Sequence, residues 1–244
     1  MTDALTLPPI QRVSGSVTLP GSKSMTNRSL LLAAVAEGET LVTNVLLSDD
    51  TQRMLDALAQ LGVQVDIDQS LRQCRVLGKG GPFPAPAKTQ TLQLGNAGTV
   101  LRPLTAMLAL TPGDFIIDGD AYMRERPIGP LTDALHAMDV STTSLGAAGY
   151  PPFHLRGGTL KGGALTLDGR LSSQYLTALL LSLPMGAVPS TIDIDGELVS
   201  KPYIDMTLAM MSTFGVQAGH TDYERFTVPG NQRYQSPGHF LVEG

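Results

Sequence analysis

The hydrophobic and polar positions of this chain repeat in three blocks. Each block begins with a short run of alternating polarity that ends in glycine: VTLPG (17–21), LQLG (92–95) and LTLDG (165–169). The three glycines are evenly spaced along the chain, at positions 21, 95 and 169. Because alternation with a period of two is typical of a half-buried strand, we predict a strand at the start of each block.

An apolar helix, a second strand and an amphipathic helix follow in each block. Nearly unbroken apolar runs predict helices buried on all sides, at 29–36, 104–110 and 175–183. Strand-like runs come next, at 40–44, 114–119 and 191–196. Apolar residues at helical spacing then predict amphipathic helices, at 54–61, 128–138 and 204–214. A strand that ends in glycine closes each block, at 74–78, 153–157 and 226–230.

The order strand–helix–strand–helix–strand–strand therefore occurs three times. Such alternation favours right-handed crossovers and helices packed on sheets. We predict an α/β fold of three βαβαββ units around a pseudo-threefold axis, with the N-termini of the buried helices open toward one end. Another alternating run, HFLVEG (239–244), again ends in glycine. We interpret it as the start of a second domain, and the chain as a fragment of a longer protein truncated before that domain.

Composition and charge argue against several classes of protein. The 244 residues are 42% hydrophobic and carry a net charge of −5, whereas a nucleic-acid binder usually has a basic excess. Cys74 is the only cysteine, which excludes a disulfide framework and a thiolate zinc site. The four histidines lack metal-ligand spacing, so we expect no metal. Because no run is typical of a signal peptide or a membrane span, we expect a cytoplasmic protein without a membrane partner.

The joint between the first strand and the first helix of each block carries the candidate chemistry. The joints read GSKSMTNR, GNAGTVLR and GRLSSQ. A helix N-terminus has unpaired N–H groups and a partial positive charge, and glycine lets an anion approach it closely. For any single serine taken by itself, such as Ser24 or Ser172, a purely structural role as an N-cap is the favoured interpretation. Together the joints predict a site for a polyanionic small molecule, formed by Lys23, Arg28, Arg102, Ser24, Ser172, Ser173, Asn96 and Gln174.

Two segments that open the amphipathic helices add charge. YMRERPIGP contains Arg124 and Arg126, and LVSKPYID contains Ser200 and Lys201. Arg126 is the better candidate for a carboxylate or phosphate clamp, because a guanidinium suits bidentate contact. Arg124 and Lys201 could be no more than solvated charges near a turn.

Other segments carry no catalytic signature. SDDTQ (48–52) predicts a helix cap through Asp49 or Asp50. The motifs of nucleoside-triphosphate loops, dinucleotide-binding turns and nucleophile elbows are absent from the sequence. No pair of carboxylates is placed for acid–base work, so binding chemistry is the stronger prediction.

Five long motifs resemble the EPSP synthase family of enolpyruvyl transferases, and the resemblance covers essentially the whole chain. The motifs are LPGSKSMTNRSLLLAA, LGNAGTVLRPL, RERPIGPL, LSSQYLTALL and LVSKPYID. The resemblance implies transfer of the enolpyruvyl group of phosphoenolpyruvate to shikimate 3-phosphate, with release of phosphate, in aromatic amino acid biosynthesis. It also implies two domains of three βαβαββ units each, which close over the substrates.

The same resemblance assigns roles to individual residues. It implies that Ser24 and Arg28 hold the carboxylate end of shikimate 3-phosphate and that Tyr203 lies against its ring. It places the phosphate at Ser172, Ser173 and Ser200, and Gln174 between the two substrates. The phosphoenolpyruvate side, where the herbicide glyphosate also binds, is assigned to Lys23, Asn96, Gly98 and Arg126, with Lys23 also near shikimate 3-phosphate.

The resemblance further implies an incomplete site. Residues 1–20 would belong to the other domain, residues 21–238 would form the shikimate 3-phosphate-binding domain, and residues 239–244 would start the second domain. The catalytic carboxylates and lysine would follow residue 244, which leaves no catalytic residue in this chain. We expect no metal or organic cofactor, weak substrate binding and essentially no activity in the chain alone, whose partner would be that second domain.

Two alternatives stay open at this point. One is the related UDP-N-acetylglucosamine enolpyruvyl transferase, which has a cysteine in an active-site loop. Cys74 lies in a predicted strand instead, and the SSQ and GNAGT motifs favour the first interpretation. The other alternative is a non-catalytic anion-binding module with no partner domain.

Overall fold

The structure, a computed structural model, describes residue 5 and residues 8–244. The strands are β1 (Glu39–Thr43), β2 (Gln64–Asp68), β3 (Gln73–Leu77), β4 (Gln90–Gln93), β5 (Gly113–Asp118), β6 (Ser141–Ser144), β7 (Phe153–Gly157), β8 (Ala164–Asp168), β9 (Ser190–Asp195), β10 (Gly219–Thr221), β11 (Arg225–Val228) and β12 (His239–Leu241). The described residues form three four-stranded sheets, with the orders β12-β1-β3-β2, β4-β5-β7-β6 and β8-β9-β11-β10.

The three sheets share one pattern of strand pairing. In each sheet a first strand runs parallel to a second, as β4 does to β5 and β8 to β9. The second strand pairs antiparallel with a closing strand, which in turn pairs antiparallel with the fourth, as β5, β7 and β6 do. This common topology confirms the prediction of three repeated α/β units.

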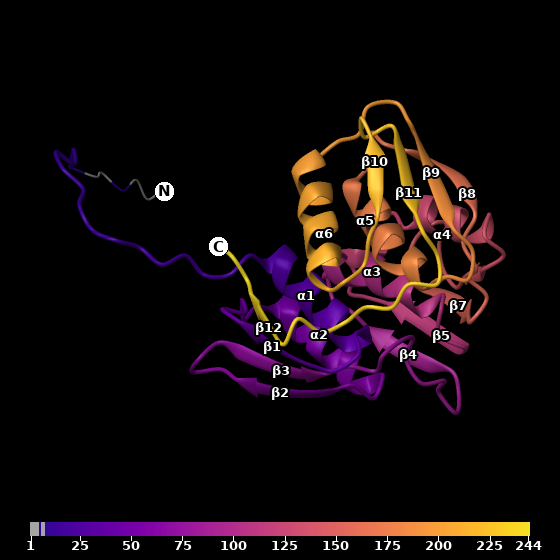
Figure 1. The fold of residues 1–244 in the computed structure, drawn as a ribbon, viewed down its shortest axis with the longest axis horizontal. Coiled ribbons are helices and arrows are strands. Elements are labelled where there is room, and N and C mark those ends of the chain that lie inside the picture. Colours follow the sequence, from indigo (N-terminus) through magenta and orange to yellow (C-terminus); the bar gives the residue numbers. More distant parts are fainter. Residues whose placement is uncertain (1–4, 6–7) are drawn as a thin grey trace.

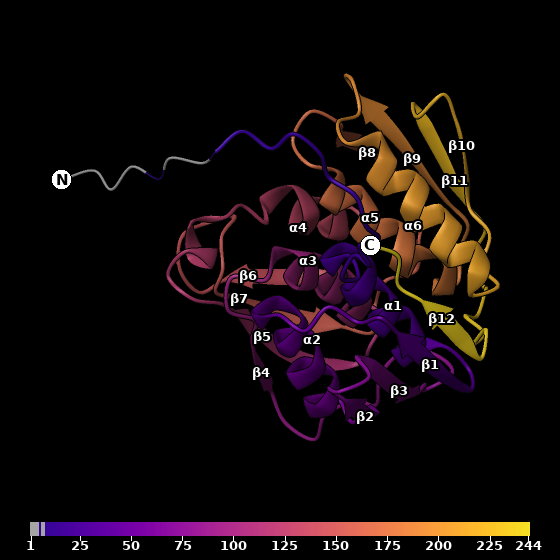
Figure 2. The same cartoon turned by 90° about the vertical axis from the view of Figure 1, so that its left-hand side faces the viewer.

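The helices lie between the sheets (Figures 1 and 2). They are α1 (Lys23–Val35), α2 (Asp49–Gln60), α3 (Gly98–Leu108), α4 (Gly129–His136), α5 (Ser173–Ser182) and α6 (Lys201–Thr213), with 3-10 turns η1 (Met123–Glu125) and η2 (Leu183–Met185). The predicted apolar helices α1, α3 and α5 are buried along nearly their whole length, and α3 contacts both of the others. Alternating burial along β1, β7 and β8 shows that each sheet packs one face on the helices.

The strand predicted at 17–21 is wrong. Residues 8–20 form no strand and are exposed, and Figure 1 shows this segment leaving the folded body. The parallel neighbour of β1 is β12, with Leu41 opposite His239. Within the run at 239–244, which we interpreted as the start of a second domain, residues His239–Leu241 form β12 and complete the first sheet. An alternating pattern marks a run that can pair but does not say with which strand.

Helix caps differ in part from the predictions. Ser22, not Ser24, caps α1 by accepting a hydrogen bond from the N–H of Met25. Ser172 caps α5 as predicted. At α2 the cap is Ser48, which forms a capping box with Thr51. The predicted caps Asp49 and Asp50 lie instead in the first turn, where a negative charge also favours the helix.

Candidate functional site

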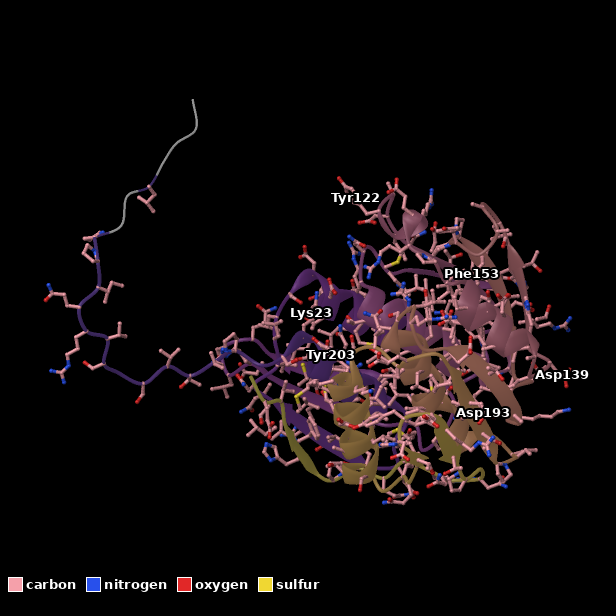
Figure 3. All side chains as sticks on the ribbon, turned by 90° about the horizontal axis from the view of Figure 1, so that it is seen from above. Lys23, Tyr122, Asp139, Phe153, Asp193 and Tyr203 are labelled. Atoms are coloured by element: carbon pink, nitrogen blue, oxygen red, sulfur yellow. The ribbon has the colours of Figure 1, made fainter. Side chains whose placement is uncertain are left out.

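The N-terminal ends of α1, α3, α5 and α6 meet at one cavity of about 220 Å³. Figure 3 shows Lys23, at the start of α1, and Tyr203, in α6, toward the side from which the N-terminal segment leaves, with Asp139 on the opposite side. The cavity is lined by Ser24, Arg28, Thr99, Pro103, Ser172, Ser173, Gln174, Thr177, Ser200 and Tyr203. This lining contains no carboxylate, so its only formal charge is positive.

Arg28 places that positive charge against the cavity. Its side chain is only 5% exposed, and it donates to the hydroxyls of Thr207 (3.1 Å) and Thr177 (3.3 Å) and to the carbonyl of Ser24 (3.1 Å). All three acceptors are uncharged, so the guanidinium has no anionic partner among them. Burial lowers the pKa of Arg28 to about 10, because desolvation disfavours the charged form. An anion in the cavity would offset that cost.

Three serine hydroxyls of the lining are free to bind a ligand. Among the described residues, the side chains of Ser24, Ser173 and Ser200 make no hydrogen bond to protein. Ser173 is nearly buried at the first position of α5, next to the N-cap Ser172. Hydroxyls beside helix N-termini form a site typical of phosphate binding.

Ser200 is held in a strained backbone conformation before α6. Its φ and ψ are 57° and 41°, the left-handed region that residues with a side chain rarely adopt. Strain of this kind persists where the surrounding structure imposes it, often at binding sites. Tyr203 follows one turn later, with its ring centroid 6.0 Å from the Cζ atom of Arg28.

The second group of predicted residues lies next to the cavity rather than in its lining. Arg126 donates from Nη1 to the backbone carbonyl of Asn96 (3.0 Å) and to its side-chain Oδ1 (3.1 Å). Gly98 is so close to this guanidinium that a Cβ atom there would lie 2.5 Å from Arg126 Nη2. These three residues therefore form one cluster. Arg102 lies between this cluster and the cavity. Its Nη1 would be 2.9 Å from a Cβ atom at Gly98, and it donates to Oε1 of Gln174 in the cavity lining.

Lys23, also of the second group, forms an ion pair with a residue outside that group. Its Nζ atom lies 3.0 Å from Oδ2 of Asp50, at the start of α2. The same Oδ2 accepts a 3.5 Å hydrogen bond from Thr99, which in turn accepts one from Asn27 at 2.8 Å. This network links the N-terminal turns of α1, α2 and α3.

The sequence left the roles of Arg124 and Lys201 undecided, and in the structure both side chains lie beside a carboxylate. Arg124 donates from Nε and Nη2 to the two carboxylate oxygens of Asp118, at 2.9 and 2.6 Å. These hydrogen bonds are the main cause that lowers the pKa of Asp118. Lys201 makes a longer contact of 3.7 Å with Glu197. Arg124 thus has a structural role, which anchors the turn before Arg126.

Sequence reasoning missed two residues of the site, Thr177 and Thr207. Thr177 lies one turn after Ser173, so helical periodicity could have added it to the lining. Thr207 gave no signal, because its contact with Arg28 depends on how α6 packs against α1.

The part of the chain that the structure describes offers little for metal or thiol chemistry. No group of three His, Cys, Asp or Glu side chains there could hold a metal ion. Cys74 is buried in β3, and burial raises the pKa of its thiol to about 11, which keeps it protonated and unreactive near neutral pH. In the same described part, no helix reaches the length and apolarity that a bilayer crossing requires.

Comparisons with known proteins agree on one family. The model of the family EPSP synthase (3-phosphoshikimate 1-carboxyvinyltransferase) matches residues 7–244. The chain is 52% identical over 244 residues to the 3-phosphoshikimate 1-carboxyvinyltransferase of Cronobacter sakazakii (strain ATCC BAA-894), and 52% identical over 242 residues to that of Klebsiella pneumoniae (strain 342). The matches cover 100% and 99% of this chain but 56% of each relative, so the chain spans about half their length.

Solved structures show the same relationship. EPSP synthase from Acinetobacter baumannii matches with a TM-score of 0.82 and 28% identity, over 93% of this chain and 49% of that one. The enolpyruvyl transferase NikO from Streptomyces tendae matches with a TM-score of 0.64 and 14% identity, over 95% of this chain and 52% of that one. At 14% identity the second likeness shows a shared fold alone.

Proposed function

Because this chain belongs to the EPSP synthase family, we propose that it is the N-terminal, substrate-binding half of a 3-phosphoshikimate 1-carboxyvinyltransferase. The intact enzyme transfers the enolpyruvyl group of phosphoenolpyruvate to shikimate 3-phosphate and releases phosphate. The observation that carries the proposal is the buried Arg28, which has no carboxylate partner among the described residues and lies at a cavity where helix N-termini and serine hydroxyls meet. The 50–52% identical relatives favour this substrate over a UDP-sugar.

The cavity is proposed to bind shikimate 3-phosphate. Arg28 and Ser24 hold the carboxylate. The guanidinium of Arg28 supplies the positive charge that pairs with this carboxylate once it has left water. Ser172, Ser173 and Ser200 hold the phosphate. The size of the cavity, about 220 Å³, and its polar lining suit a small polyanion. Tyr203 packs on the shikimate ring.

The adjacent cluster is proposed to bind phosphoenolpyruvate, or glyphosate in its place. Arg126 supplies the clamp, and Gly98 leaves room for its guanidinium beside the N-terminus of α3. Asn96 fixes the Arg126 guanidinium. Lys23 joins the site from α1, and Gln174 lies between the two ligands. The cations and helix termini offset the repulsion between two anionic substrates, which is the main electrostatic obstacle to their reaction.

The rest of the site is proposed to come from a second domain. The reaction needs one group to protonate the enolpyruvyl methylene and another to deprotonate the shikimate hydroxyl, and the lining of the cavity contains no such carboxylate. A second domain that closes over the cavity would supply these groups and exclude water. Residues 1–20 would belong to that domain. The chain alone is then a weak binder without transferase activity, in a cytoplasmic enzyme.

Titration of the 15N-labelled chain with shikimate 3-phosphate tests the proposal. Shikimate 3-phosphate should shift the backbone amide resonances of Ser24, Ser173 and Ser200, with weak affinity. Shikimate and inorganic phosphate are the matched controls, since each lacks one anionic group, and both should bind less tightly. Equal affinity for all three ligands, or shifts at residues away from the cavity, would contradict the proposal.

A further inference from the structure

Arg102 lies behind the cavity, between the two groups of candidate binding residues. It is 5% exposed and belongs to α3, one turn after Gly98. Its Nη1 donates to Oε1 of Gln174 over 2.6 Å, and its Nη2 donates to the carbonyl of Pro127 over 3.0 Å. Gln174 lines the cavity, whereas Pro127 directly follows Arg126. One buried side chain therefore connects both groups.

The stability of the fold does not explain this arginine. Among its contacts in the described chain there is no carboxylate, and the Nε–H group is buried without a hydrogen-bond partner. Its Cζ atom lies 5.2 Å from the ring centroid of Tyr175, which offsets only part of the desolvation cost. A buried cation with an unsatisfied donor destabilises a fold. An apolar residue in α3 would avoid that cost, so a role in the site accounts better for the arginine.

The hydrogen bond from Arg102 determines which end of an amide faces the cavity. A guanidinium can only donate, so it selects the oxygen of the Gln174 amide. The Nε2 group of Gln174 makes no hydrogen bond to any described residue and remains available as a donor. Without a fixed donor behind it, a glutamine amide can present either its oxygen or its NH2 group.

We propose that Arg102 is a positioning residue that orients the Gln174 amide with its NH2 group toward the ligands. The position then accepts only a ligand atom that can receive a hydrogen bond, as anionic oxygens and hydroxyl oxygens can. The bond from Arg102 to Pro127 also ties this amide to the turn that carries Arg126, so the two ligand positions keep a constant separation. This inference rests on the proposed function of the cavity.

A first test needs no ligand. In the 15N-labelled 244-residue chain, the hydrogen bond to Gln174 should slow the rotation of the Arg102 guanidinium and give separate, downfield Nη–H resonances. Gln174→Ala should collapse these resonances, whereas Ser144→Ala, at an exposed position of β6, should leave them unchanged. Identical Arg102 resonances in wild type and Gln174→Ala would overturn the inference.

A second test measures shikimate 3-phosphate affinity by calorimetry. Gln174→Ala and Arg102→Met should each weaken binding by roughly five- to tenfold, and the double variant should be no weaker than Gln174→Ala alone. Additive losses would overturn the inference, because Arg102 would then act independently of the amide. Arg225→Met, which removes an arginine that pairs with Asp193 on the third sheet, is the matched control and should bind as wild type does.

Two conservative variants cover the case in which Arg102→Met fails to fold. Arg102→Lys keeps the charge and a donor, and should recover part of the affinity. Gln174→Glu keeps an acceptor for Arg102 but presents a second carboxylate oxygen to an anionic ligand, so it should bind more weakly than Gln174→Ala. Equal or tighter binding by Gln174→Glu would overturn the inference. If the wild-type chain binds no shikimate 3-phosphate, the proposed function fails, while the Arg102 resonances still report on the amide.

Discussion

Arg28 donates from Nε to Oγ1 of Thr207 over 3.1 Å, although 179 residues separate them in the chain. Arg28 lies in the first helix of the first unit, and Thr207 in the last helix of the third. The contact joins the two units at the edge of the cavity. Because threonine is neutral, it holds the guanidinium in place without neutralising it, so the charge stays available to an anion.

Replacing Arg28 by Met should separate binding from stability. Shikimate 3-phosphate affinity should fall by roughly 10- to 150-fold, since a hydrogen bond to a charged group contributes about 1.5–3 kcal/mol. The free energy of unfolding should fall by no more than about 1 kcal/mol, because the variant also removes the desolvation cost of a buried charge. Calorimetric titration and urea denaturation measure the two quantities. Unchanged affinity in a folded variant would refute the assigned role.

The secondary structure could be predicted from the sequence because the units repeat. Buried helices such as α1 have apolar side chains all round, and short sheet strands alternate, so local pattern and final fold agree. The prediction failed in the choice of the strand that pairs with β1. Residues 17–21 alternate as well as β12 does, yet β12 pairs with β1. Pairing is a long-range choice, which periodicity within one segment does not encode.

The site could be predicted only as far as its residues belong to the joints. Ser24, Ser173 and Gln174 closely follow the repeated glycines at positions 21 and 169, so their position at helix N-termini was visible in the sequence. The residues that hold the charged side chains of the site in place were not visible in the sequence. Thr207 holds Arg28, and Asp50 holds Lys23, across contacts that exist only after the helices pack.

Ser173→Ala should weaken the binding of shikimate 3-phosphate and leave that of phosphoenolpyruvate nearly unchanged. The hydroxyl lines the cavity and makes no hydrogen bond to any residue that the structure describes, so its loss removes a ligand contact and no structural hydrogen bond. Titration of each ligand against the intact enzyme measures the split. Ser144→Ala, at an exposed position of β6, is the matched control and should match wild type for both ligands. A loss confined to phosphoenolpyruvate would contradict the assignment.

Arg126→Ala should weaken the binding of phosphoenolpyruvate more than the binding of shikimate 3-phosphate. The guanidinium lies beside Asn96 and Gly98, outside the lining of the cavity. Phosphoenolpyruvate affinity of the intact enzyme should therefore fall by at least about tenfold, as expected for a lost charge-assisted hydrogen bond, with a smaller effect on shikimate 3-phosphate. Unchanged affinity for both ligands would refute the role of this arginine as the clamp.

Gly98→Ala should disturb the same clamp without unfolding the protein. A Cβ atom at this position would lie 2.5 Å from Arg126 Nη2 and 2.9 Å from Arg102 Nη1. Arg126 is partly exposed and can move, whereas Arg102 is buried and hydrogen-bonded to Gln174 and Pro127. The free energy of unfolding should therefore fall by about 1–3 kcal/mol, as at an overpacked site. Phosphoenolpyruvate affinity should drop more than that of shikimate 3-phosphate, because Arg126 moves away from Asn96. Equal losses for the two ligands would indicate a general distortion of α3 instead.

Asp118→Asn should make the stability of the protein less dependent on acid pH. Hydrogen bonds from Arg124, then from Gln93 and the N–H of Gly119, hold the pKa of Asp118 below its ordinary value of 3.8. A carboxyl whose pKa is lowered by folding stabilises the protein above pH 3.8, and this contribution disappears as the pH falls through the folded-state value. The variant should therefore be less stable than wild type by roughly 1–3 kcal/mol at pH 7, since a buried hydrogen-bonded charge is lost.

That difference in the free energy of unfolding should narrow as the pH falls from 3.8, the ordinary pKa that Asp118 has in the unfolded chain, toward its lower pKa in the folded protein. Urea denaturation at pH 7, 4 and 3 measures it. Asp193→Asn, which removes the exposed partner of Arg225, is the matched control and should change the stability little at any of these pH values. A difference between Asp118→Asn and wild type that stays constant from pH 7 to pH 3 would show that the ionised carboxylate does not anchor Arg124. The turn before Arg126 would then owe its position to packing alone.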